Sequence, residues 1–130
     1  MRVLLPLAAL LLVAAPAAAA RPDPQAQLDR LIGDRQPGAP IQCITILPTT
    51  GSTTIDRLGT VYQNGSTLYL NRFEQGCPEL TFDSFLVTRQ PTGQLCRGDI
   101  ALIQSRTQPA IPRGSCIFGM FTPYAKVKTK

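Results

Sequence analysis

Four cysteines set the tightest limit on how this 130-residue chain can fold. They are Cys43, Cys77, Cys96 and Cys116, and the closest two stand nineteen residues apart. An even cysteine count in an exported chain is typical of disulfides, and four cysteines allow three pairings. A zinc site would need close pairs such as Cys-x-x-Cys, and the chain has no histidine. We therefore expect two disulfides, with the pairing open at this point, and no metal or cofactor.

The N-terminus, residues 1–20, is organised like a secretory signal peptide. A positive start and an apolar run over residues 3–13 precede small residues that end at Ala20. A membrane anchor is the alternative, but the apolar run is short for spanning a bilayer. We expect cleavage after Ala20 and a periplasmic or secreted mature chain, residues 21–130, without a transmembrane segment.

The mature chain is mildly basic. The 13 basic and 8 acidic residues give a net charge of +5, and removing Arg2 with the signal peptide leaves +4. This charge fits an anionic polymer, but it also fits ordinary solubility because the charges are interspersed. An envelope protein or an anionic envelope polymer remains open as the partner, and no nucleic acid is expected.

Residues 21–40 are predicted to form an N-terminal arm and linker. Asp23 can cap a helix that has Pro24 at its first position, and Gly33 can end it. Between these ends, three apolar residues lie at helical spacing, Leu28, Leu31 and Ile32. The short helix could dock a partner or lie on its own domain, and the second interpretation is favoured.

A β-hairpin is predicted between residues 60 and 71. The dipeptide Asn64-Gly65 suits a two-residue type I′ turn, which requires positive φ at both positions. That turn would pair Val61 with Leu68. One face of the hairpin is then aliphatic and predicted to face the core, whereas the other, which carries Tyr62, can tolerate water.

Residues 41–130 are predicted to form one disulfide-stabilised β-domain. Residues 41–47 suit a strand and 48–53 a turn, and about six short β segments in all alternate with turns rich in proline, glycine and asparagine. This pattern favours a mostly β fold, a small antiparallel barrel or sandwich with a short N-terminal helix or arm.

The residue types exclude several chemistries. Without histidine there is no Ser-His or Cys-His pair, and no glycine-rich phosphate loop is present. Four carboxylates could supply a general acid and base, Glu74, Glu79, Asp83 and Asp99, but their spacing selects no pair. Asp99 is better explained as a partner of turn backbone or of an arginine such as Arg72. We therefore expect no enzyme.

Aromatic and basic residues interleave near the C-terminus. Phe121 and Tyr124 are followed by Lys126 and Lys128, a mixture that can bind sugars or nucleic acid. Such aromatics more often belong to the core, with the lysines at a solvated end. We mark these four residues as a possible binding surface.

Several segments together resemble a group of small exported proteins from alphaproteobacteria that are described as hypothetical. They include Leu70-Asn71-Arg72, Gln94-Leu95-Cys96 and Gly119–Tyr124, and the resemblance covers residues 41–124. It implies a bacterial periplasmic or secreted protein. It also implies that Cys43 pairs with Cys96 and Cys77 with Cys116. The group has no established activity, so the resemblance implies no functional residues.

Three functions remain as hypotheses. The first is a non-enzymatic envelope domain with a binding or structural role. The second is a periplasmic hydrolase inhibitor, similar to the small disulfide-bonded lysozyme inhibitors, although a positive charge disfavours a basic lysozyme as target. The third is a carboxylate-dependent hydrolase.

Overall fold

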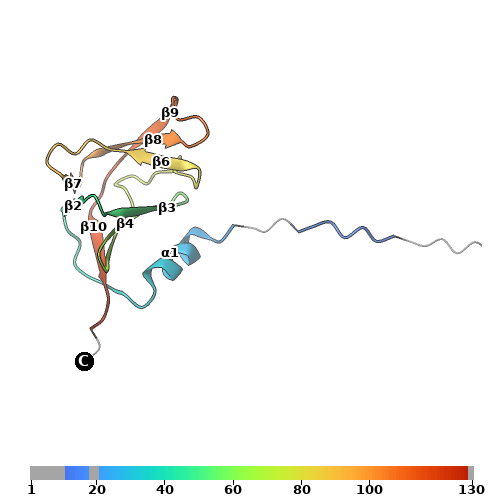
Figure 1. Ribbon diagram of the computed structural model, residues 1–130, viewed down its shortest axis with the longest axis horizontal. Coiled ribbons are helices and arrows are strands. Elements are labelled where there is room, and N and C mark those ends of the chain that lie inside the picture. Colours follow the sequence, from blue (N-terminus) through green and yellow to red (C-terminus); the bar gives the residue numbers. More distant parts are fainter. Residues whose placement is uncertain (1–10, 18–20, 129–130) are drawn as a thin grey trace, which may run out of the picture.

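The computed structural model describes residues 11–17 and 21–128, and its helix and strands lie between residues 24 and 125 (Figure 1). The predicted cleavage site at Ala20, and most of the predicted signal peptide, lie outside the described residues. No helix of the described ranges has the length and apolar character needed to cross a bilayer.

In the part of the chain that the structure describes, one helix, α1 (Pro24–Ile32), precedes ten strands. The strands are β1 (Gln36–Pro37), β2 (Cys43–Thr45), β3 (Gly51–Ile55), β4 (Gly59–Asn64), β5 (Thr67–Asn71), β6 (Ser84–Val87), β7 (Gln94–Cys96), β8 (Ile100–Ser105), β9 (Pro112–Ile117) and β10 (Phe121–Ala125). The predicted mostly β class is confirmed, with more strands than the six or so expected.

These strands of residues 21–128 form three antiparallel sheets. A five-stranded sheet has the order β1-β10-β5-β4-β3, a three-stranded sheet has the order β6-β8-β9, and β2 pairs with β7. None of these sheets closes into a barrel within the described residues, so the fold is sandwich-like. A turn around Asp99 separates β7 from β8.

The helix begins and ends as predicted. The Asp23 side chain accepts a hydrogen bond from the Ala26 amide at 3.2 Å, Pro24 is the first helical residue, and Gly33 ends the helix with φ +62°. Leu28 is 1% exposed and packs on the aliphatic cluster of the five-stranded sheet. Because β1 also pairs with β10, residues 21–40 belong to the same folded body as the β-domain.

Both faces of the five-stranded sheet are covered. On one face, α1 packs against the aliphatic cluster Ile55, Val61, Leu68 and Leu70. On the other face, Tyr62 is 8% exposed and packs with Phe118 and Phe121 toward the three-stranded sheet. The expectation that the Tyr62 face tolerates water is therefore wrong, because a second sheet covers it.

The hairpin forms, but its register differs from the prediction by two residues. Asn64 pairs with Thr67 and Val61 with Leu70, so Gly65 and Ser66 are the central turn residues. Of these two, only Gly65 has positive φ, +58°, which fits a type II′ turn and not type I′. A shift of two residues preserves the faces of both strands, since side chains alternate with a period of two.

The disulfides are Cys43–Cys96 and Cys77–Cys116, as the resemblance implied. Cys43 and Cys96 are opposite each other in the β2–β7 pair. Cys77 and Cys116 are 1% and 6% exposed and lie within the core cluster. Both bridges therefore tie together segments that are distant along the chain.

Candidate binding site

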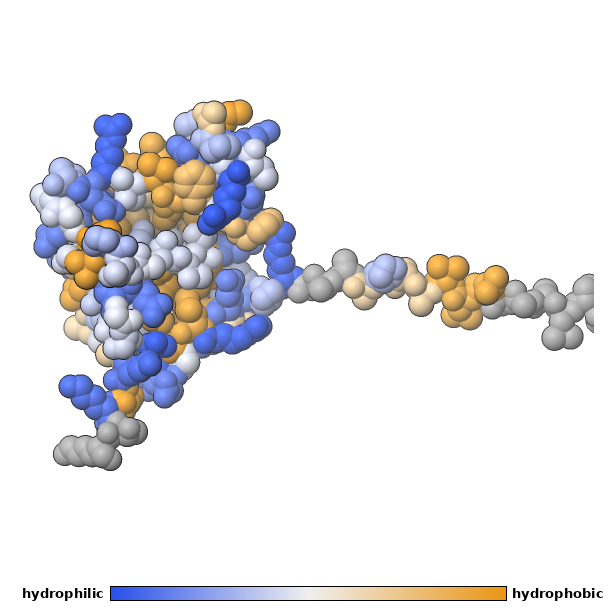
Figure 2. Space-filling model, in the orientation of Figure 1, coloured by the Kyte–Doolittle hydropathy of each residue, from blue (hydrophilic) through white to orange (hydrophobic). Residues whose placement is uncertain are grey.

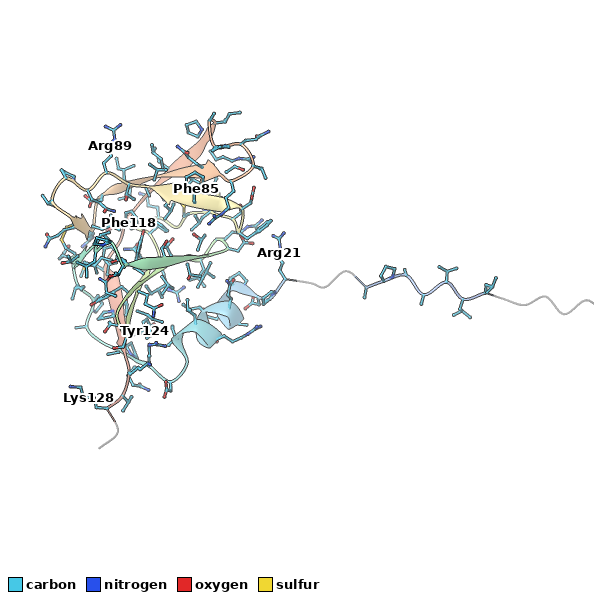
Figure 3. The ribbon with its side chains drawn as sticks, viewed as in Figure 1. Arg21, Phe85, Arg89, Phe118, Tyr124 and Lys128 are labelled. Carbon is cyan, nitrogen blue, oxygen red and sulfur yellow. A yellow bond between two sulfur atoms is a disulfide. The ribbon has the colours of Figure 1, made fainter. Side chains whose placement is uncertain are left out.

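The structure does not bring the predicted C-terminal surface together. Phe121 is fully buried, because β10 lies inside the five-stranded sheet and Phe121 stacks on Phe118 with ring centroids 6.0 Å apart. The assignment of Phe121 to a binding surface is therefore wrong. Tyr124 is half-buried against the aliphatic cluster, whereas Lys126 and Lys128 are exposed beyond the last strand. Figure 3 shows Tyr124 and Lys128 in these positions.

Two of the four candidate carboxylates hold backbone and side-chain partners near β7. Asp99 Oδ2 accepts a hydrogen bond from the Cys96 amide at 2.8 Å, which confirms its turn role. Glu74 forms an ion pair with Arg97. Arg72 is not the partner of Asp99.

The other two carboxylates lie elsewhere in the fold. Asp83 Oδ2 accepts hydrogen bonds from Ser105 Oγ at 3.0 Å and Thr107 Oγ1 at 3.1 Å. The Glu79 carboxylate lies directly against Gly114, which has no side chain to displace it. The four carboxylates thus have four separate sets of partners. The described residues also contain no group of three or more His, Cys, Asp and Glu side chains that could hold a metal ion.

The outer face of the three-stranded sheet carries exposed apolar side chains. Along β8, Ala101 and Ile103 are buried, whereas Ile100 and Leu102 are 60% and 42% exposed. The register places Val87 opposite Leu102 and Ile117 opposite Ile100, and Ile117 is 43% exposed. We call Val87, Ile100, Leu102 and Ile117 the apolar face.

The apolar face borders a hollow of about 640 Å³. Its lining includes Val87, Ile100 and Leu102, with Arg89 and Asp99 as the charged residues. Figure 2 shows hydrophobic side chains gathered over β6 and β8, and Figure 3 shows Arg89 extending outward beside them. The Asp99 carboxylate is directed to the Cys96 amide and is partly buried, whereas Arg89 is exposed at the rim of the hollow.

Sequence reasoning did not find the apolar face. Ile100-Ala101-Leu102-Ile103 is an uninterrupted apolar run, and such a run does not show which face of a strand is covered. One indication was the small number of helical segments. The only helix of the described residues packs on the five-stranded sheet, so no helix is left to cover the outer face of the three-stranded sheet.

Comparisons with protein-family models, with curated proteins and with solved structures found no match to this chain.

Proposed function

We propose that this chain is an exported, non-enzymatic domain of the bacterial envelope that binds a protein partner through its apolar face. The observation that carries the proposal is the exposure of Ile100, Leu102 and Ile117 side by side on one sheet. Exposed apolar side chains are ordinary when scattered, but a contiguous patch on a small domain is typical of an interaction surface. Arg89 at its rim and the positive net charge favour a partner with acidic residues around its own apolar surface.

Export to the periplasm or the medium rests on three observations. The N-terminal sequence has signal-peptide organisation, the resemblance is to exported bacterial proteins, and the chain contains two disulfides. A non-enzymatic role is supported by the separate structural partners of Glu74, Asp83 and Asp99, since paired catalytic carboxylates would need to converge on one substrate.

The experiment captures the partner with purified domain added to envelope extract. Wild-type domain is expected to retain one stoichiometric protein, and Leu102→Asp is expected to lose it, because a charge in a buried apolar interface is strongly unfavourable. Ile111→Asp is the matched control, since Ile111 is 58% exposed but outside the apolar face.

Equal retention by Leu102→Asp and wild type would overturn the assignment of the apolar face. If the domain retains an envelope polymer and no protein, the proposal of a protein partner is wrong. If the retained protein is a hydrolase that loses activity on binding, the domain is an inhibitor. The comparison of Leu102→Asp with Ile111→Asp still tests whether the apolar face is the binding surface.

A further inference from the structure

A small cleft lies between the five-stranded and the three-stranded sheets, beside the edge strand β3. Its volume is about 160 Å³, enough for roughly five water molecules at the density of the liquid. Its polar lining consists of five hydroxyl residues and one arginine, Ser52, Thr54, Thr60, Tyr62, Thr88 and Arg106. We call this the hydroxyl cleft, and it is separate from the apolar face.

The strand register concentrates the hydroxyl groups. Ser52 on β3 is directly opposite Tyr62 on β4, and Thr54 is directly opposite Thr60. Because side chains alternate along a strand, these four hydroxyl residues share one face of the five-stranded sheet. Thr88 follows β6 and Arg106 follows β8, so the second sheet contributes the facing side.

One hydroxyl of this face has no hydrogen-bond partner among the described residues. Thr60 is 1% exposed, and its Oγ1 is buried and unpaired. A buried polar group without a partner is destabilising and uncommon in folded proteins, so a ligand that forms a hydrogen bond with the Thr60 hydroxyl would remove an energetic cost. Tyr62 beside it is also buried, and desolvation raises the pKa of its phenol, which therefore remains a neutral donor.

The charge in the cleft has one sign. Arg106 is the only charged residue of the lining, it is exposed, and its guanidinium forms no ion pair with the described residues. Its amide donates to the Asp83 carbonyl at 2.8 Å, which fixes the backbone from which the side chain extends. A guanidinium presents a planar fork of donors that matches carboxylate and phosphate oxygens, and hydroxyl groups can rotate to donate to the same oxygens.

We propose that the hydroxyl cleft binds a small oxyanion group, a carboxylate or a phosphate, with Arg106 at its mouth and Thr60 and Tyr62 at its floor. The oxyanion would be free or would form the end of a larger molecule. This site is independent of the partner bound by the apolar face, so either could exist without the other.

The test is an NMR titration of the isotopically labelled mature domain with inorganic phosphate, and separately with acetate, at constant ionic strength. Saturable shifts are expected for amides of β3 and β4 around the cleft. Arg106→Gln is expected to weaken binding at least about tenfold, because a charge-assisted hydrogen bond is lost. Arg113 is an exposed arginine of the three-stranded sheet and lies outside the cleft. Arg113→Gln is therefore the matched control and is expected to bind as wild type.

Thr60→Val separates a ligand contact from a purely structural hydroxyl. Valine has nearly the same shape, and the hydroxyl has no partner to lose among the described residues, so the melting temperature should stay the same or rise. Binding of the oxyanion should fall about threefold to tenfold.

Three outcomes would overturn the proposal. They are the absence of saturable shifts with both anions, an equal loss of affinity in Arg106→Gln and Arg113→Gln, and unchanged affinity in Thr60→Val. Saturation by acetate alone, or by phosphate alone, would support the site and identify which oxyanion it takes.

Discussion

At the scale of single residues, Asn71 holds together three parts of the chain. It is fully buried, its Nδ2 donates to the Gly119 carbonyl at 2.8 Å, and its Oδ1 accepts from the amides of Phe73 and Gly119, each at 3.0 Å. The Asn71 backbone carbonyl also lies against Gly59, where a Cβ atom would overlap it. Sequence reasoning did not predict this role, because a single asparagine at a strand end gives no sign of burial.

The close approach at Gly59 gives a matched pair of substitutions. Gly59→Ala is expected to destabilise the domain by about 1–3 kcal/mol, because the Asn71 carbonyl is backbone and has little freedom to move. Gly51→Ala, at the start of the adjacent strand, has open space around the new methyl group and should be neutral or slightly stabilising. Urea denaturation of both variants measures the difference, and equal free energies of unfolding would contradict the close contact.

At the scale of elements, the sequence predicts that a helix or a hairpin exists better than it predicts which residues pair across the strands. The helix is predictable through its cap at Asp23 and its stop at Gly33, because both are local signals. The turn is misplaced because Asn64 has a long-range role. Its Nδ2 donates to the Thr45 carbonyl at 2.8 Å and its Oδ1 accepts from Thr50 Oγ1, so Asn64 is fixed in β4 and not in the turn.

The two registers predict opposite effects for Asn64→Gly. In a type I′ turn, glycine would be well tolerated at this position because φ would be positive. In the observed register, the substitution removes two hydrogen bonds and places glycine in a strand, so we expect a loss of about 1–3 kcal/mol. Ser66→Gly, at an exposed turn position, is the control and should change stability little. Thermal denaturation distinguishes the registers, and a neutral Asn64→Gly would favour the type I′ turn.

A substitution at Gly65 tests the same turn, because Gly65 is its only central residue with positive φ. Its φ of +58° is unfavourable for a β-branched side chain, although a Cβ atom added there would meet nothing within 4 Å. Gly65→Val is therefore expected to destabilise the domain by about 1–3 kcal/mol through backbone strain alone. An unchanged melting temperature would show that the backbone at this position can relax without cost.

At the scale of the whole molecule, the arrangement is a helix, a five-stranded sheet and a second sheet packed in that order. The mostly β class could be predicted from the short segments and their turns. The two candidate sites could not, because each depends on which sheet covers which face. The hydroxyl cleft has a period-two signal in Ser52-x-Thr54 and Thr60-x-Tyr62, but residues 48–53 suit a turn by sequence, which concealed the first half.

The two disulfides stabilise this arrangement in different surroundings. Their sequence separations are 53 and 39 residues, so the loss of loop entropy in the unfolded chain is about 4 kcal/mol for each. The Cys77–Cys116 bridge lies in the core, whereas Cys43 and Cys96 are only partly buried. The two bridges therefore contribute nearly the same loop entropy. A difference in stability between variants that lack one bridge or the other would come from packing around the sulfur atoms.

Replacing each bridge by two alanines should therefore reveal the packing contribution. Cys43→Ala with Cys96→Ala is expected to lower the free energy of unfolding by about 4 kcal/mol. Cys77→Ala with Cys116→Ala should cost about 1–2 kcal/mol more, because two buried sulfur atoms leave unfilled space in the core. Urea denaturation of both variants, with oxidised wild type as reference, gives the comparison. A larger cost for the Cys43–Cys96 bridge would mean that the two-stranded β2–β7 sheet, and not the core around Cys77, is where the fold most depends on a covalent link.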